Sequence, residues 1–484
     1  MQVVVGRDAA AGARAAARRR RARFALGAAL LVSAAAPTAT AAEPPARRRA
    51  AAQAQAAPAL ALPEALGAGV PAVVVASPGQ AVDIALARAP ILRSAEAGRR
   101  AALGDRVQAG LRPNPEARLD NQSFAASGPY RGRSPLETSV GLSQRIETAG
   151  KRQARVEAAG RAVTLTGLDA EAVRLDLVRE VVRALAGAVA GVRAAAIARE
   201  RVRLADEVLR ATRARVEAGR EPFVQQHRAE VARETAAVGF ERSQREAAVL
   251  QRALSVLLAA PRVEVAADRA AWFDDIGPKP DPARAPALPP GQLDRARLDA
   301  LIDQRRAELD LQRRNAVPDV TVNGAVGRFR EASQTAAATA FVLGLSVPLP
   351  VFDRNQGNIL RAGAEVNRAE ADAERGRLYL DTALADAERR LDQAWRAADS
   401  LRRTVQPAAE QAAGFAREGY AAGKFSLLEV LDSQGALSNV REQLNAALLE
   451  VQQVRADIAR LRGRAADPAL AAAPVGAPVG RPLP

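Results

Sequence analysis

The stretch "AAATAFVLGLSVPLPVFDRNQGN", Ala336 to Asn358, decides the fold because it is apolar enough to enter a membrane. Its uncharged part approaches the ~17 to 25 residues of a spanning helix. Pro348, Pro350 and Gly344 oppose a helix, since proline removes a backbone donor and glycine lowers helical propensity. As a strand it has one apolar face and one small or mildly polar face. The apolar face carries Phe341, Leu343, Leu345, Val347 and Leu349, and the other carries Val342, Gly344, Ser346 and Pro348. The stretch predicts a half-buried strand of a soluble sheet or a lipid-facing barrel strand.

The composition of the 484-residue chain favours long, closely packed helices, since alanine dominates and aromatic residues make up only 3%. The chain has no cysteine, which excludes disulfides, a lipidated N-terminal cysteine and cysteine metal sites. Its one histidine, His227, lies among polar residues of a predicted helix and should face solvent. Without a nucleophile–base pair, phosphate loop or ligand cluster, the sequence predicts neither an enzyme nor a cofactor site.

The formal net charge of +16 raises nucleic acid as a partner. Arginine carries nearly all of the positive charge and is interleaved with acidic residues along predicted helices. Part of the excess lies in the first 23 residues, ahead of an apolar core from Phe24 to Ala36 and "ATA" at Ala39 to Ala41. This order is typical of a signal peptide, so we expect residues 1–41 to direct export through the general secretory route and to be removed. An exported chain with mixed charge is not expected to bind nucleic acid; strong salt-dependent DNA binding would contradict this.

The mature chain repeats itself. Pro115 is answered by Pro318 and "GLSQ" at Gly141 by "GLSV" at Gly344, both at an offset of 203, and Gly219 is answered by Gly423 at an offset of 204. Three matches in order indicate two copies of one structural unit.

Each copy is predicted to contain a helix, two alternating strands and a long helical hairpin. The first unit is expected to span residues 78–260, with a helix at 78–111, a strand pair at 115–147 and a tip at Gly219. The second unit is expected to span residues 291–464, with a helix at 292–316, a strand pair at 318–350 and a tip at Gly423. A flexible segment 42–77 should precede the first unit, a linker 261–290 with little pattern should join the two, and a disordered tail 465–484 should follow the second.

Heptads in the predicted hairpins indicate coiled-coil packing. One runs from Leu175 to Val192, another from Leu380 to Val405 and a third from Leu437 to Leu461. About 70 residues after Ala149 lack proline, which corresponds to a helix on the order of 100 Å. Pro407 should kink the matching helix of the second unit.

Four strands cannot cross a bilayer alone, because an open sheet edge leaves backbone groups unsatisfied in hydrocarbon. Closed barrels need about eight strands or more, so several chains would share one barrel. Two chains would supply eight strands and three would supply twelve. A soluble trimeric coiled coil with small sheets is the alternative on pattern alone.

Three motifs carry a resemblance to a known family: "ETAGKRQARVEAAG" from Glu147, "GLSVPLPVFDRNQGNILRAGAEV" from Gly344 and "GYAAGKFSLLEVLDSQGALSNVREQL" from Gly419. The chain resembles outer-membrane efflux proteins of the TolC family from about Pro78 to Gly463, and most resembles the subgroup that serves heavy-metal resistance-nodulation-division pumps. The resemblance implies a mainly helical protein whose three copies form a twelve-stranded β-barrel, four strands from each, continued by a periplasmic helical barrel.

The resemblance also implies roles for residues. The tips, with Gly219, Arg220, Gly423, Lys424 and Ser426, would contact a periplasmic adaptor protein. Glu429 and Asp432 would ring the channel constriction; the alternative is an ordinary solvated helix face. Tyr420, Lys424 and Phe425 would lie near the gate. Some members place an arginine where this chain has Phe425, which leaves the gating ion pair undefined.

The resemblance thus implies a passive trimeric exit duct in outer-membrane lipid, energised by an inner-membrane pump through the adaptor. The alternatives are a duct for drugs or for polypeptides of type I secretion, and a soluble periplasmic coiled-coil scaffold.

Overall fold

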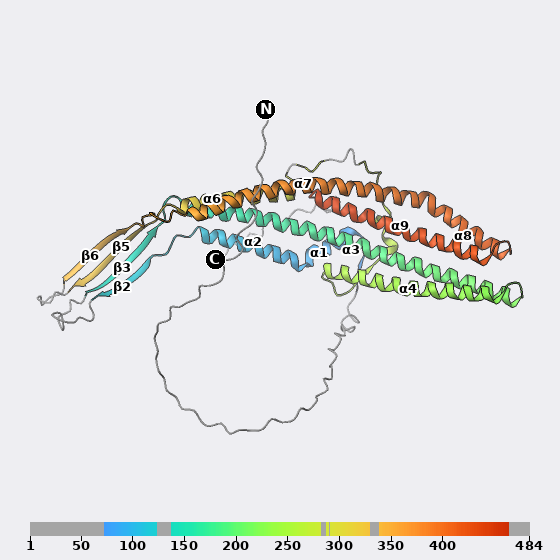
Figure 1. Ribbon diagram of the computed structural model, residues 1–484. Coiled ribbons are helices and arrows are strands. Elements are labelled where there is room, and N and C mark those ends of the chain that lie inside the picture. The colour runs from blue at the N-terminus through green and yellow to red at the C-terminus, as the bar shows by residue number, and fades with distance from the viewer. Residues whose placement is uncertain (1–71, 123–136, 282–286, 290, 330–337, 464–484) are drawn as a thin grey trace, which may run out of the picture. The chain divides into compact units, whose positions relative to one another are not determined.

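The computed structural model describes residues 72–122, 137–281, 287–289, 291–329 and 338–463. All of them belong to one compact unit, Glu64–Pro484 (Figure 1). The predicted signal peptide, residues 42–71 of the predicted flexible segment and the predicted tail 465–484 lie outside the described residues.

Two long helical hairpins make up most of the described chain. The first consists of α3 (Lys151–Glu217) and α4 (Phe223–Leu257). The second consists of α7 (Gln356–Ser400), a π turn η5 (Leu401–Val405), α8 (Gln406–Ala421) and α9 (Leu427–Leu461). Shorter helices precede them: α1 (Pro78–Arg88) and α2 (Pro90–Ala109) before the first, α6 (Leu293–Asn315) before the second.

Helix α3 forms the centre of the packing. It has 67 residues, which corresponds to about 100 Å. Its apolar part is long and apolar enough to cross a membrane, yet half of that part is buried against the other helices. Leu175, Val178, Val182, Leu185 and Val189 are all buried, so the predicted heptad packs in the protein core.

The second hairpin also packs through its predicted heptads, with Leu384, Val451 and Val454 buried. Near Pro407 the helix changes to the π turn η5, in which the Gln406 N–H bonds the Leu401 carbonyl. A proline ring clashes with the carbonyl four residues earlier, and the wider π turn accommodates it. The predicted interruption therefore takes the form of a π turn.

The four predicted strands form one antiparallel sheet in the order β2-β3-β5-β6. The strands are β2 (Glu116–Gln122), β3 (Glu137–Ile146), β5 (Val320–Phe329) and β6 (Ala338–Ser346). The sheet lies at the end of the helices where α3 begins (Figure 1). The last strand was predicted to reach Leu349 but ends at Ser346, because Pro348 and Pro350 cannot donate hydrogen bonds to a ladder.

Two other predictions were wrong in detail. The expected single helix 78–111 is divided at Ala89, which is extended because it precedes Pro90. Residues 73–75 of the segment expected to be flexible form β1 (Val73–Val75), which pairs in parallel with β4 (Val263–Val265) of the predicted linker. That linker also contains a short helix, α5 (Ala271–Asp274), whose Phe273 is fully buried. Strands of three residues are too short to show alternation in a sequence.

Candidate functional site

The two helical hairpins end in tips with the same backbone geometry. Gly219 and Gly423 have φ values of 67° and 71°, a left-handed conformation that glycine adopts without a Cβ penalty. In each tip the N–H of the next residue bonds a carbonyl five residues earlier at 2.8 Å: Arg220 to Arg215, and Lys424 to Gly419. This is the hydrogen bond of a Schellman cap. The tips lie side by side, away from the sheet (Figure 1).

The second tip starts its return helix with a capping box. Ser426 is the N-cap of α9; its N–H and hydroxyl contact the Glu429 carboxylate at 2.6 and 2.9 Å. These bonds hold the pKa of Glu429 below its ordinary value. The spacing Ser-x-x-Glu is itself a capping-box pattern and was readable in the sequence.

Glu429 and Asp432 both lie exposed on one face of α9, one turn apart. Asp432 forms no hydrogen bond or ion pair with any residue that the structure describes. The geometry places the two carboxylates as the constriction prediction requires, but it is also that of a solvated helix face.

Tyr420 joins the second hairpin to the first. Its buried hydroxyl lies 2.9 Å from the Thr212 hydroxyl and donates to Glu221 Oε2 at 3.3 Å. Arg215 donates from Nη1 to the Tyr420 carbonyl at 2.7 Å, and its guanidinium lies 4.8 Å from the centre of the tyrosine ring. Arg215 Nε also pairs with Glu221 Oε1 at 3.0 Å. Burial raises the pKa of Tyr420. We call Thr212, Arg215, Glu221 and Tyr420 the tip cluster.

The basic residue beside Tyr420 is thus Arg215, not Lys424. Among the described residues, the Lys424 ammonium has no hydrogen bond or ion pair. Phe425 packs over Gly419, where a Cβ would lie 2.2 Å from its ring. Sequence reasoning missed Thr212, Arg215 and Glu221, which lie some 200 residues from Tyr420 in the chain. Their only sequence signal is that they flank Gly219.

The sheet has one apolar face. Paired residues Leu119, Val140, Val326 and Phe341 form one row across all four strands, and Ala117, Leu142, Gly324 and Leu343 form the next row on the same face. No described residue covers it: Phe341 and Leu343 are 83% and 84% exposed. The opposite face carries small and polar residues, including Arg118, Asp120, Ser139, Ser143 and Asn323.

Helix α4 carries a second uncovered apolar surface. Val224, Val231, Val238, Val249 and Val256 are exposed and spaced by 7, 7, 11 and 7 residues, which places them on one side of the helix. We call this the α4 valine stripe. In α9, by contrast, Leu428 is the one exposed large apolar residue.

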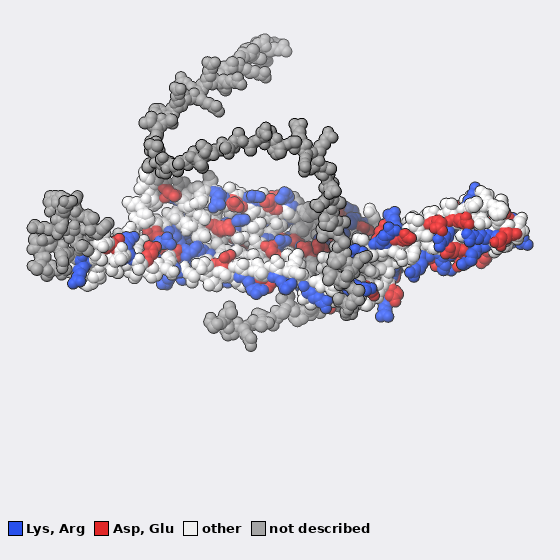
Figure 2. Space-filling model, turned by 90° about the horizontal axis from the view of Figure 1, so that it is seen from below, with Lys and Arg blue, Asp and Glu red and all other residues white. Residues whose placement is uncertain are grey.

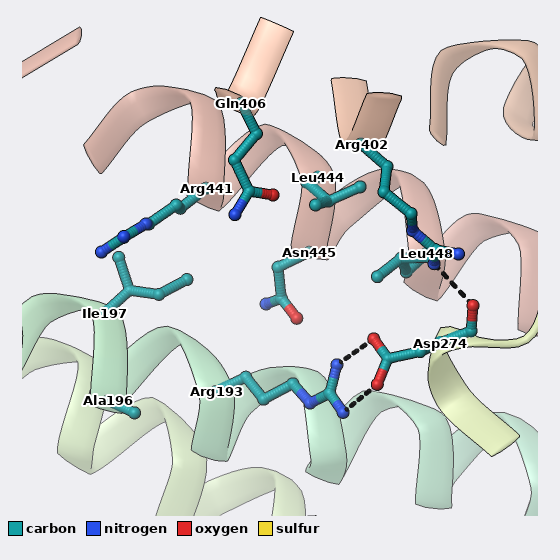
Figure 3. A pocket seen from close by; sticks show the side chains of 10 residues that line it. All are labelled: Arg193, Ala196, Ile197, Asp274, Arg402, Gln406, Arg441, Leu444, Asn445 and Leu448. Carbon is teal, nitrogen blue, oxygen red and sulfur yellow. Dashed lines mark hydrogen bonds and ion pairs between the residues drawn. The ribbon is translucent and has the colours of Figure 1, made fainter. Parts of the chain in front are cut away.

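A cavity of about 470 Å³ lies between α3, η5, α8, α9 and the residues of α5 (Figure 3). Arg193 makes two bonds to the Asp274 carboxylate, at 2.6 and 2.7 Å, and Arg402 donates to the Asp274 carbonyl at 2.5 Å. These contacts fasten the short linker helix to both hairpins, so the polar lining acts as an anchor.

Acidic and basic side chains are interspersed along the helices on the face seen in Figure 2. The single histidine, His227, is 74% exposed and contacts Glu230. No group of three or more His, Cys, Asp or Glu side chains suited to a metal ion occurs in the described parts of the chain.

Comparison with known proteins identifies several similar proteins. The family described as outer membrane efflux protein matches residues 81–260 and 293–464. The cobalt-zinc-cadmium resistance protein CzcC of Cupriavidus metallidurans is 30% identical over 374 residues, 75% of this chain and 84% of that protein. The nickel-cobalt-cadmium resistance protein NccC of Alcaligenes xylosoxydans xylosoxydans is 27% identical over 308 residues, 62% of this chain and 67% of that protein.

Solved structures share the fold. CusC superimposes with a TM-score of 0.65 at 18% identity, covering 80% of this chain and 92% of that chain. The outer membrane protein VceC of Vibrio cholerae gives 0.64 at 18% identity, covering 81% and 97%.

Proposed function

The chain belongs to the outer membrane efflux protein family, and from this premise we propose that three copies form one passive exit duct for heavy-metal cations. Members of this family are transport conduits rather than enzymes. The energy would come from an inner-membrane resistance-nodulation-division pump that reaches the duct through a periplasmic adaptor. Residues 1–41 would direct export, and the boundaries 78–260, 261–290 and 291–464 would separate the two units and their linker.

The exposed apolar face of the sheet is the observation that carries the proposal. Apolar rows run across four strands with no described residue over them, while the other face is mostly small and polar, as expected when lipid lies outside and water inside. Within the described chain, β2 and β6 each have one unpaired edge. Lipid cannot satisfy those backbone groups, so β2 of one copy would pair with β6 of the next. Three copies would supply twelve strands.

The α4 valine stripe supports association of the helical parts. Five exposed valines on one side of a helix would be covered by a neighbouring copy in a helical barrel. Each buried valine contributes roughly 1.5 kcal/mol, so the stripe alone favours assembly by several kcal/mol before the costs of association.

The tips would contact the adaptor and keep the periplasmic end of the channel narrow. The tip cluster keeps the second hairpin against the first, so breaking it would let the hairpins separate and the channel widen. Three copies would bring three Glu429 and three Asp432 carboxylates near one axis, a ring that attracts cations. Gly219, Arg220, Gly423, Lys424 and Ser426 would form the surface that the adaptor contacts.

The metal substrate rests on the relatives, whose names record resistance to cobalt, zinc, cadmium and nickel. The test is deletion of the gene, followed by growth on zinc, cobalt, cadmium and nickel and on a cationic dye. We expect metal tolerance to fall and to return with the intact gene. Unchanged metal tolerance together with dye sensitivity would replace the metal duct by a drug duct. Recovery of the protein in the soluble periplasm without detergent would exclude any duct.

The ring is tested by Glu429→Ala combined with Asp432→Ala. The double variant should raise the conductance of the closed channel or reduce its cation selectivity in planar bilayers. Single-channel currents identical to those of the parent would contradict the ring.

A further inference from the structure

We propose that the α4 valine stripe of one copy packs against one side of η5 and α8 in the next copy, where Val405, Ala408, Ala412 and Phe415 form a second exposed apolar surface. We call these four residues the α8 stripe. The inference rests on the proposed function, because it names the surface that a neighbouring copy in the duct would offer to α4.

The order of the helices leaves α4 and α8 at opposite edges of one layer. Towards the tips, α4 packs on α3, α3 on α9 and α9 on α8, so the layer runs in the order α4-α3-α9-α8 (Figure 1). The sheet runs in the order β2-β3-β5-β6. In both layers an element of the first unit forms one edge and an element of the second unit forms the other. A ring in which β2 of one copy pairs with β6 of the next therefore brings α4 of the first copy beside α8 of the next.

The α8 stripe has the spacing of a coiled-coil seam, with steps of 3, 4 and 3 residues. Phe415 is 67% exposed and Val405 is 36% exposed. The residues that α8 buries within its own chain are different ones, Ala413, Ala416 and Tyr420. The α8 stripe is therefore free to contact a neighbour while α8 stays packed on α9.

The two stripes match in their distance from the tips. Because the tips have the same backbone geometry and lie side by side, the start of α4 is level with the end of α8. Val231 lies eight residues beyond the start of α4. Phe415 and Ala412 lie six and nine residues before the end of α8. Val231 would therefore lie between these two residues of the next copy, as a knob fits a hole in a coiled coil.

Val238 repeats this match one heptad further from the tip. It lies fifteen residues beyond the start of α4, while Ala408 and Val405 lie thirteen and sixteen residues before the end of α8. A branched valine on one helix thus meets an alanine on the other at both levels. Alternation of large and small side chains across a contact lets two helices approach closely and interdigitate.

The contact is large enough to contribute to a stable assembly. Helix α4 has 35 residues and is about 50 Å long and roughly 10 Å wide, so an edge contact along it buries on the order of 1,000 Å² over both copies. Specific interfaces begin near this size, and the paired sheet edges would add to it. Helix α4 carries five arginines and four glutamates, whereas α8 carries one arginine and two glutamates, so their net charges have opposite sign.

The chain has no cysteine, so pairs of introduced cysteines can test the contact by disulfide cross-linking of the full-length protein in membranes. Val238→Cys with Ala408→Cys, and Val231→Cys with Ala412→Cys, should each give a covalent trimer on non-reducing gels, because three links close the ring. Reduction should return monomers. The control, Ala237→Cys with Ala408→Cys, moves the first cysteine about 100° round α4, beyond the ~4 Å between Cβ atoms that a disulfide needs. It should migrate as a monomer.

A trimer on native gels that neither cysteine pair cross-links would overturn this inference and leave the duct standing. Cross-linked dimers of the single variant Val238→Cys would show that two α4 stripes contact each other, and a link to a different protein would show that an adaptor covers α4; either result would also overturn it. If one cysteine pair prevents assembly, the other gives the same comparison. A parent protein that is monomeric in mild detergent would overturn the inference together with the proposed function.

Discussion

Helices α4 and α9, which return from the two tips, have the same length and begin in the same way, but α9 is largely buried and α4 is largely exposed. Each has 35 residues and begins four residues after a left-handed glycine. Helix α9 buries thirteen residues, whereas α4 buries four and exposes the valine stripe. At the positions where α9 carries Glu429 and Asp432, α4 carries Gln225 and Arg228.

The two repeats therefore share the backbone of the hairpin and differ in the side chains on its returning helix. The backbone at each tip needs only a glycine and a Schellman bond, so the side chains beyond it were free to diverge. Helix α9 buries one side in the described chain and presents acidic groups near its start, while α4 leaves an apolar side exposed. The tip cluster then ties the two dissimilar hairpins together.

The largest effect should come from a charge in the α4 valine stripe. Val238→Asp would place a carboxylate in the proposed apolar contact between copies, at a cost of several kcal/mol per contact. We expect loss of the trimer on native gels. Gln244→Asp, an exposed position on the other side of the same helix, is the matched control and should remain trimeric. A trimeric Val238→Asp protein would mean that α4 and α9 do not differ in the proposed way.

The tip cluster gives the next largest effect. Arg215→Gln leaves Glu221, 13% exposed, without its cation. The expected cost is about 2 kcal/mol, between the roughly 3 to 5 kcal/mol of a buried pair and the less than about 1 kcal/mol of an exposed one. The hairpins should separate more readily, which single-channel recording would detect as higher conductance.

Arg213→Gln serves as the control for that experiment, because Arg213 lies on the same helix as Arg215 but pairs at the surface with Glu230 of α4. It should leave the conductance unchanged. If both variants conduct like the parent, the hairpins are not held by Arg215.

The tip glycines test whether the two backbones are equivalent. Gly219→Ala and Gly423→Ala each force a Cβ into the left-handed region, at about 1 to 2 kcal/mol. Thermal unfolding should reveal similar losses of stability for both variants. Adaptor binding, measured by pull-down, should weaken in both variants. Weaker binding in only one variant would show that the adaptor contacts a single hairpin.

The smallest expected effect is the response of the Glu429 capping box to low pH. The lowered pKa of Glu429 means that its stabilising contribution is complete above the ordinary carboxyl pKa and is lost as pH falls through the lowered, folded-state value. The first turn of α9 should therefore exchange its amide hydrogens faster at low pH, after correction for intrinsic rates. The first turn of α4, with Gln225 in place of the glutamate, should not respond. Ser426→Ala should remove much of the response of α9, and an equal response of both helices would contradict the role of the capping box.

The regular parts of this fold were predictable because they repeat at short range. Alternation gave the apolar face around Phe341 and Leu343, heptads gave the buried side of α3, and glycine marked both tips. The Ser426 capping box was also readable from its spacing.

Contacts between distant segments were not predictable, because pairing between them leaves no local pattern. Arg215 reaches Tyr420 across some 200 residues, and β1 pairs with β4 across a similar separation. In each case the partner is chosen by the tertiary arrangement rather than by neighbours in the chain.

The two open sheet edges have a consequence for stoichiometry. Because β2 of one copy would meet β6 of the next, the contact is heterologous, and nothing in the hydrogen-bonding edges limits how many copies can join. Only the rotation from one copy to its neighbour sets the count, and a ring of three closes when that rotation is 120°. Variants that alter the packing angle, without weakening the contact, should therefore yield rings of another size or open chains rather than monomers.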